Sequence, residues 1–272
     1  METDQQPEPP EEAETMPNRE QIQLGDLSRS VTIEITIKND LHDGRLIELN
    51  NKMVQQLKRM AVDKLEGGFG IVYISKQKVP GFNIPVVLKE IDLRHQIGIQ
   101  SQTQKLGSVT NEKIASRMMH FGIVPLLAYH DDHANKKYYL VSPYLENGDL
   151  FQAIATDKGL SKDAMKLRWE IRTKIMYQIA CAIDFMHTGN KLRGTVLHLD
   201  IKSKNIVLDA MFNARLIDFG IARELKEGDV NITVTTTNVG TLGYFSADQH
   251  YVLTKHHDYH NFGVGKYLVC IT

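Results

Sequence analysis

The chain has 272 residues, of which 42% are hydrophobic and 24% charged, and its formal net charge at pH 7 is -1. This composition is that of an ordinary globular protein with a substantial core, and no Lys/Arg run indicates nucleic acid as a partner. Two cysteines, Cys181 and Cys270, exclude a disulfide framework, and no stretch reaches the roughly 18 apolar residues that span a bilayer. We therefore expect a soluble, cytoplasmic protein without a membrane span.

The N-terminal part divides into a tail and a short extension. Residues 1–28 are acidic and proline-rich and predict a disordered tail, because their apolar surface is too small to offset chain entropy. The alternating sequence VTIEITIK (31–38) predicts a strand. Four apolar residues then recur at helical spacing and predict a short amphipathic helix: Leu46, Leu49, Met53 and Leu57. Residues 29–56 are thus expected to form an extension of strand and helix.

From Leu57 the pattern changes to short strands. We predict strands at 57–65, 71–78 and 85–93, a helix at 108–119, and a hairpin of 122–130 with 136–144. After Gly148 the pattern becomes helical. One apolar stripe predicts a long helix that ends near Thr188: Ile171, Ile175, Ile179, Ile183 and Met186. Strands followed by helices indicate an α+β fold with two lobes.

Two polar segments carry residues suited to phosphoryl transfer. HLDIKSKN (198–205) follows the long helix, and IDFGIAR (217–223) places a second aspartate before a glycine. Asp200 could accept the proton of an attacking hydroxyl, while Asn205 and Asp218 could bind Mg²⁺ through oxygen.

These segments resemble motifs of the protein kinase family. HLDIKSKN is similar to the catalytic loop, and Asp218-Phe219-Gly220 to the magnesium-binding triplet. Residues 85–89 resemble the strand with the phosphate-binding lysine, and 65–72 the glycine-rich loop. Segments 240–248 and 258–263 resemble the end of the activation segment and the start of the buried helix. Three segments resemble the tyrosine-kinase-like group, in particular receptor-like and Pelle/IRAK-type kinases: 169–175, 235–245 and 258–264.

The resemblance implies a kinase domain at 57–272, with an antiparallel β N-lobe (57–145) and a mainly helical C-lobe (146–272) that is incomplete at the C-terminus. It implies a Ser/Thr kinase that uses ATP and Mg²⁺ on protein substrates, since Lys202 and Thr241 match Ser/Thr kinases. Asp200 and Lys202 would be catalytic, and Asn205 and Asp218 would bind metal. The implied ATP-binding residues are Leu65, Gly67, Gly70, Val72, Val87, Lys89 and Val207.

The chain departs from the family pattern at several positions. Leu65 replaces the first glycine of the phosphate loop, and Leu199 replaces the arginine that pairs with a phosphorylated activation loop. The helix-to-strand spacing of the family, counted back from His120, puts Asn111 at the position of the partner of Lys89. Glu112 is the next residue, about 100° around the helix.

These departures leave alternatives open. Either Glu112 is the partner of Lys89 or the pair is lost. The loop threonines could be phosphosites or an exposed polar loop: Thr233, Thr235, Thr236 and Thr237. The alternative function is a pseudokinase, a nucleotide-binding module that regulates a protein partner.

Overall fold

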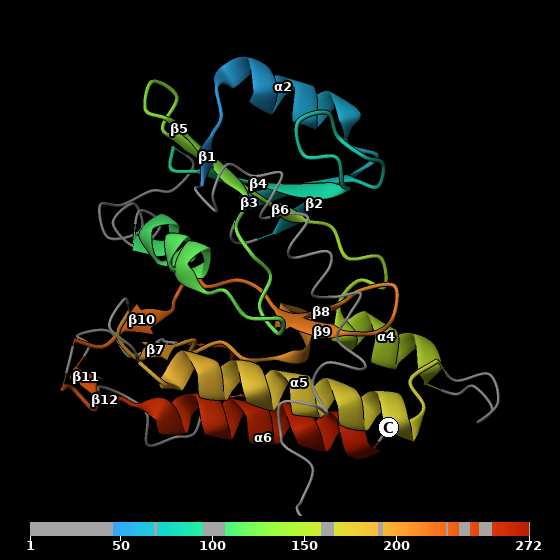
Figure 1. The fold of residues 1–272 in the computed structure, drawn as a ribbon, viewed down its shortest axis with the longest axis vertical. Helices are drawn as coiled ribbons and strands as arrows, with labels where there is room; N and C mark the ends of the chain where they lie inside the picture. Colours follow the sequence, from blue (N-terminus) through green and yellow to red (C-terminus); the bar gives the residue numbers. More distant parts are fainter. Residues whose placement is uncertain are drawn as a thin grey trace, which may run out of the picture.

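The computed structural model describes residues 46–67, 70–94, 107–158, 166–189, 193–226, 228–233, 240–244 and 252–271, with side chains up to residue 265. The expected tail and the strand at 31–38 lie outside these residues. The described chain has an α+β fold with two lobes, a β-sheet above and mainly helices below (Figure 1).

The upper lobe is built on a six-stranded sheet in the order β1-β5-β6-β4-β3-β2. The strands are β1 Ile47–Glu48, β2 Asp63–Gly67, β3 Gly70–Ser75, β4 Val86–Asp92, β5 Ala128–Asp132 and β6 Lys137–Pro143. All neighbours are antiparallel except β1 and β5. The expected hairpin is confirmed as β5 and β6, although β5 begins only at Ala128.

The sheet is covered by a helix that includes the first residues of the segment 57–65, where we predicted a strand. Helix α2 spans Asn51–Met60, and its N-cap Asn50 accepts a hydrogen bond from the Met53 amide at 3.0 Å. The prediction of a strand over the whole of 57–65 is therefore wrong, because the chain stays helical to Met60 and packs Val54 and Leu57 into the core.

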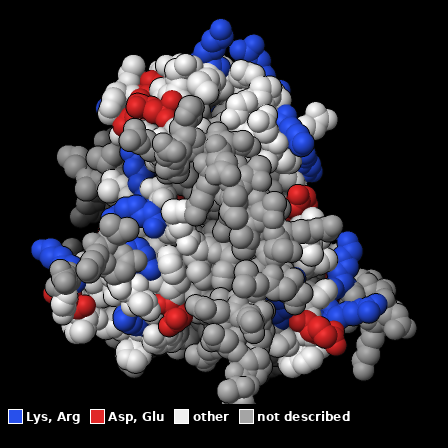
Figure 2. Space-filling model, in the orientation of Figure 1, with Lys and Arg blue, Asp and Glu red and all other residues white. Residues whose placement is uncertain are grey.

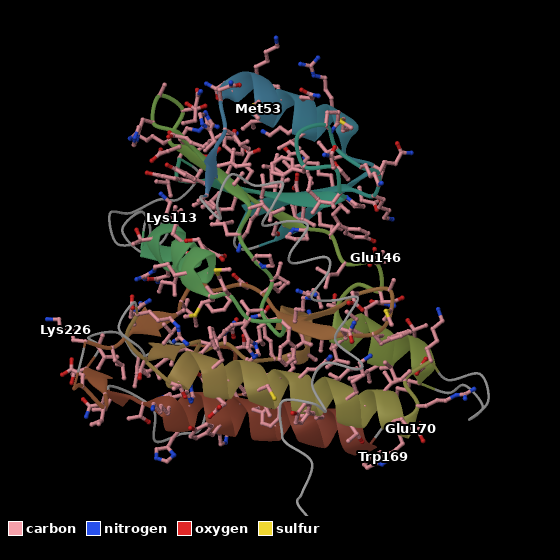
Figure 3. All side chains as sticks on the ribbon, in the orientation of Figure 1. Met53, Lys113, Glu146, Trp169, Glu170 and Lys226 are labelled. Atoms are coloured by element: carbon pink, nitrogen blue, oxygen red, sulfur yellow. The ribbon has the colours of Figure 1, made fainter. Side chains whose placement is uncertain are left out.

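The predicted extent and buried face of this helix also need correction. Leu46 and Leu49 precede α2, because the neighbouring β1 pairs with β5 and the Asn50 cap starts the helix after them. Met53, expected on the apolar face, lies on α2 (Figure 3) and is 36% exposed.

Helix α2 runs across the boundary that we predicted between residues 56 and 57. Leu49, Val54 and Leu57 share one core cluster with the sheet residues Val86 and Leu88. Because these residues are buried together, we propose that the upper lobe includes the chain from at least Leu49 onward. Lys52, Lys58 and Arg59 are the only charged residues of α2. Blue Lys and Arg side chains lie at the top of the upper lobe in Figure 2, where α2 lies in Figure 1.

The lower lobe contains α4 Leu150–Asp157, α5 Trp169–His187 and α6 Lys255–Ile271. Its short strands pair as β7 Val196–Leu197 with β10 Arg223–Glu224, β8 Ile206–Leu208 with β9 Ala214–Leu216, and β11 Ile232–Thr233 with β12 Val252–Leu253. The described chain also contains a helical stretch at 107–112, followed by the 3-10 helix η2 Lys113–Arg117, and a second 3-10 helix, η3 Ser203–Asn205.

The long helix agrees with the prediction. Its stripe is buried at Ile175, Ile179, Ile183 and Met186, where α5 packs on β9 and α6. The two antiparallel helices form the base of the lobe in Figure 1. Among the described helices, none has both the length and the apolar character needed to cross a membrane.

Candidate active site

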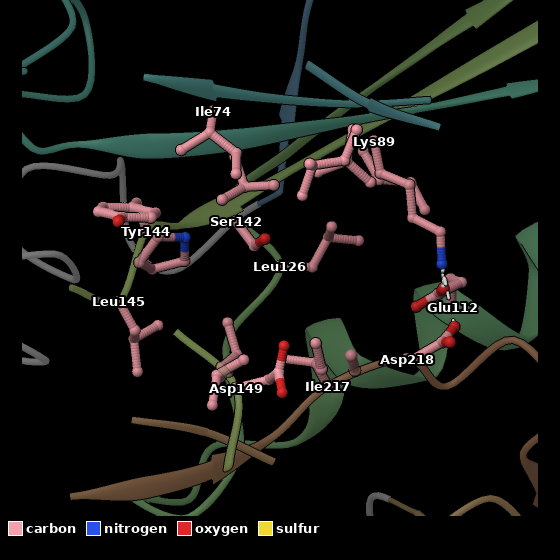
Figure 4. Close-up of a pocket in the computed structure, with 18 of the residues that line it drawn as sticks. Ile74, Lys89, Glu112, Leu126, Ser142, Tyr144, Leu145, Asp149, Ile217 and Asp218 are labelled. Atoms are coloured by element: carbon pink, nitrogen blue, oxygen red, sulfur yellow. Dashed lines mark hydrogen bonds and ion pairs between the residues drawn. The ribbon is translucent and has the colours of Figure 1, made fainter. Parts of the chain in front are cut away.

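A cavity of about 450 Å³ lies between the sheet and the lower lobe. Strands β2, β3 and β4 form its upper wall, and β8 with residues 217–219 forms its lower wall. Figure 4 shows Lys89 reaching toward Glu112 and Asp218 at one end, with Tyr144 and Leu145 at the other. The cavity gathers eight residues that the sequence marked as candidates: Leu65, Gly70, Val72, Val87, Lys89, Glu112, Val207 and Asp218.

The turn between β2 and β3 places glycine where no other residue fits. Gly67 and Gly70 are register partners across this turn. Gly70 has a φ of 132°, and a Cβ there would lie 2.0 Å from the Glu90 carbonyl oxygen. The close approach of β3 to β4 therefore requires glycine at this position. The Leu65 side chain remains largely exposed at the mouth of the cavity.

Lys89 joins two carboxylates from distant parts of the chain. Its Nζ lies 2.5 Å from Glu112 Oε1 and 3.0 Å from Asp218 Oδ1. Burial by itself would lower the pKa of Lys89, but the two carboxylates outweigh it and raise that pKa above its ordinary value. For Asp218, burial opposes ionisation, but the attraction of Lys89 lowers the pKa overall. The group thus holds one more carboxylate than ammonium.

The structure places Glu112, and not Asn111, beside Lys89. Residues 107–112 are helical, but η2 continues the segment as a 3-10 helix. A 3-10 helix turns about 120° per residue and an α-helix about 100°, so the five residues of η2 add about 100°. This rotation brings Glu112 to the angle that Asn111 would occupy on a continuous α-helix. Asn111 instead donates to the Gly220 carbonyl at 3.0 Å.

A second polar cluster surrounds the buried Asp200. The Thr241 hydroxyl donates to Asp200 Oδ1 at 2.5 Å, and Lys202 Nζ donates to Oδ2 at 2.6 Å and to Thr241 Oγ1 at 2.6 Å. Asn205 Nδ2 donates to the Asp200 carbonyl at 2.8 Å and to Oδ2 at 2.9 Å. The four predicted residues thus form one hydrogen-bonded group, in which the Asp200 carboxylate only accepts.

Asp258 fixes the backbone of this loop, a role that the sequence analysis missed. Its fully buried carboxylate accepts the amide hydrogens of His198 at 2.9 Å and Leu199 at 2.7 Å. It also lies 2.8 Å from His187 Nε2. These bonds hold the loop although Leu199 adopts a φ of 68°, which is uncommon for a non-glycine residue. The sequence signal that could have indicated this role is that Asp258 is an acidic residue in the first turn of a helix with an apolar end.

His198 connects the same loop to the strand before Asp218. Its Nδ1 accepts the Asp200 amide hydrogen at 3.3 Å, so its Nε2 carries the proton and donates to the Ile217 carbonyl at 3.1 Å. Asp218 itself has a φ of 68°. The two hydrogen bonds of His198 fix the Asp200 cluster relative to the group of Lys89, Glu112 and Asp218.

Leu199 lies in an apolar cluster instead of at the surface. Its side chain is 2% exposed and packs with three leucines from β7, β12 and the residue after β10: Leu197, Leu253 and Leu225. This apolar contact does not depend on a phosphorylated residue, unlike the pairing of the arginine that Leu199 replaces. It joins the loop before Asp200 to the segment that follows Asp218.

Comparison with known proteins agrees with this arrangement. Residues 65–269 match the model of the family described as "Protein kinase domain". A probable LRR receptor-like serine/threonine-protein kinase of Arabidopsis thaliana is 30% identical over 206 residues, which cover 73% of this chain and 21% of the relative. A probable receptor-like serine/threonine-protein kinase of the same plant is 33% identical over 201 residues, covering 73% and 42%.

A similar protein occurs in rice. An L-type lectin-domain containing receptor kinase of Oryza sativa subsp. japonica is 35% identical over 147 residues, which cover 53% of this chain and 20% of the relative. The chain therefore spans between 20% and 42% of the length of these three curated relatives.

Proposed function

The chain belongs to the protein kinase family, and from this premise we propose that it transfers the γ-phosphoryl group of ATP to Ser/Thr hydroxyls of proteins. The observation that carries the proposal is the contact of Lys89 with Glu112 and Asp218 at the end of an apolar-walled cavity. Two of the relatives are named as receptor-like serine/threonine-protein kinases, and this supports the proposal. We further propose that the activity is cytoplasmic.

The cavity suits a nucleotide. In the proposed arrangement Val72, Val87 and Val207 contact the base, because all three line the apolar part of the cavity. Leu65 covers its mouth, and the turn of Gly67 and Gly70 brings backbone close to the phosphates. Lys89 neutralises phosphate charge, held in place by its two carboxylates.

The residues present also fit Mg²⁺. Asp218 is ionised at neutral pH because its pKa is lowered, and the Lys89 group has an excess of one carboxylate. Asn205 uses its Nδ2 on Asp200, which leaves the amide oxygen as an acceptor. Few protein oxygens are needed, since magnesium keeps waters and phosphate ligands. Bound by Asn205 and Asp218, Mg²⁺ would neutralise charge on the phosphates.

Asp200 acts on the acceptor. Its carboxylate takes the proton of the substrate hydroxyl, whose oxygen bonds to the γ-phosphorus as the bond to the β-phosphate oxygen breaks. Lys202 offsets the developing negative charge from its position 2.6 Å from Asp200 Oδ2. Thr241, bonded to both residues, borders the place of the acceptor.

A direct test is to incubate the purified chain with Mg-ATP and a generic protein acceptor. We expect phosphate transfer that depends on magnesium and is absent in Asp200→Asn. Magnesium-dependent nucleotide binding without any transfer would instead favour the pseudokinase alternative.

The phosphate should appear on serine or threonine. Lys202 and Thr241, which match Ser/Thr kinases in the sequence, both donate hydrogen bonds to the Asp200 carboxylate. Phosphoamino-acid analysis of the product checks this expectation. Mainly phosphotyrosine would reject the assignment of acceptor class.

Activity should depend little on threonine phosphorylation in the loop. Leu199 is buried in an apolar cluster and offers no bidentate donor to a phosphate. Joint replacement of Thr233, Thr235, Thr236 and Thr237 by alanine should therefore reduce kcat only modestly. Phosphatase treatment of the wild type should likewise have a small effect.

The loop variant also has a clear contrary outcome. A loss near that of Asp200→Asn would mean that another basic group binds a loop phosphate. Of the four threonines, Thr233 is described and exposed on β11, while the others lie outside the described residues.

A further inference from the structure

The segment with Glu112 meets the segment after Asp218 at a second place. Arg117, at the end of η2, donates to Glu224 in β10 through two guanidinium nitrogens. Nη2 lies 2.6 Å from Oε2 and Nη1 lies 3.5 Å from Oε1. This pairing of two donors with two oxygens fixes orientation better than a contact between point charges.

Glu224 is itself held against the catalytic loop. Its Oε1 accepts the Gly194 amide hydrogen at 2.9 Å, and β10 pairs with β7 just before His198. A Cβ at Gly194 would lie 2.2 Å from the Leu225 carbonyl oxygen, so the two strands approach closely. Burial opposes ionisation of Glu224, but Gly194 and Arg117 lower its pKa overall. The carboxylate is thus a fixed negative charge at neutral pH.

The two attachments lie at opposite ends of one short helical segment. At one end Glu112 binds Lys89 and accepts the Phe219 amide hydrogen at 3.2 Å. At the other end Arg117 binds Glu224. A segment held at one point can still rotate, whereas two points fix its angle. The angle matters here, because it decides whether Glu112 or Asn111 faces Lys89.

We propose that Arg117 and Glu224 are positioning residues, which keep Glu112 against Lys89 by tying η2 to β10 without any modification of the loop. The inference rests on the proposed kinase function for its effect on turnover. Its effect on Mg-ATP affinity can be measured separately. The pair is partly exposed, with side chains 49% and 26% accessible, so its contribution to global stability is expected to be small.

The test compares charge removal at each position with a matched pair elsewhere. Glu224→Gln keeps an oxygen for the Gly194 amide but removes the charge, and Arg117→Gln removes the other partner. The control is Arg94→Gln, which breaks an exposed arginine–aspartate contact with Asp92, also of 2.6 Å. Melting temperature, Mg-ATP affinity and kcat are measured on the full chain with magnesium present.

Each single variant should lower kcat and Mg-ATP affinity by about three- to tenfold with little change in melting temperature. The double variant R117Q/E224Q should be no worse than either single variant, and Arg117→Lys, which keeps the positive charge, should lose less than Arg117→Gln. Arg94→Gln should match wild type.

Contrary results are equally specific. The inference is overturned if the single variants keep wild-type affinity and kcat, or if their losses add in the double variant. It is also overturned if the losses only follow a fall in melting temperature and Arg117→Lys loses as much as Arg117→Gln. A wild type that binds Mg-ATP but transfers no phosphate would contradict the proposed function alone, since the affinity comparison would still decide this inference.

Discussion

Asp200→Asn is expected to remove phosphoryl transfer while leaving Mg-ATP binding nearly unchanged. The single asparagine oxygen can still accept from Lys202 and Asn205, and its Nδ2 can donate to the Thr241 hydroxyl, which keeps the cluster together. The amide cannot take up the substrate proton at neutral pH. General bases typically contribute about 10²–10⁴ to the rate, so kcat should fall by that factor. Radiolabelled phosphate transfer and calorimetric Mg-ATP titration measure the two quantities.

Asp218→Asn is the partner experiment, because it should weaken Mg-ATP binding, which Asp200→Asn leaves nearly unchanged. Losing this carboxylate removes both a proposed magnesium ligand and one counter-charge of Lys89. Mg-ATP affinity should fall by at least about tenfold, because even indirect partners of a metal commonly contribute this much. The exposed Asp229→Asn is the control. Equal Mg-ATP affinity in wild type and Asp218→Asn would contradict the metal assignment.

Asp258→Ala is expected to destabilise the fold more than any surface change. The variant leaves the buried amides of His198 and Leu199 without their acceptor and removes the hydrogen-bond partner of His187 Nε2. An unsatisfied buried donor costs about 1–3 kcal/mol, so the two amides together cost about 2–6 kcal/mol, out of about 5–15 kcal/mol for a whole domain. The melting temperature should therefore fall by roughly 4–24 °C.

Thermal unfolding followed by circular dichroism measures this shift, with Asp229→Ala as the exposed control. Asp258→Asn should lie between alanine and wild type, because its amide keeps one oxygen acceptor. A melting temperature equal to that of the control would show that the loop at Leu199 does not need the Asp258 carboxylate.

The sequence by itself determined the features that depend on neighbours along the chain. The stripe from Ile171 to Met186 predicted α5, and residues 136–144, predicted as the second strand of a hairpin, form β6. The order of HLDIKSKN and IDFGIAR predicted the family, because motif order survives where individual residues change.

Tertiary structure decided the features that depend on distant contacts. Leu46 and Leu49 continued a helical pattern, yet pairing of β1 with β5 excluded them from α2. The choice between Asn111 and Glu112 depended on the winding of η2, which changes the rotation of a helix without changing its sequence pattern. Periodicity records only which residues share a face. The direction of that face is set by partners such as Lys89, which lie far away in sequence and near only in the folded chain.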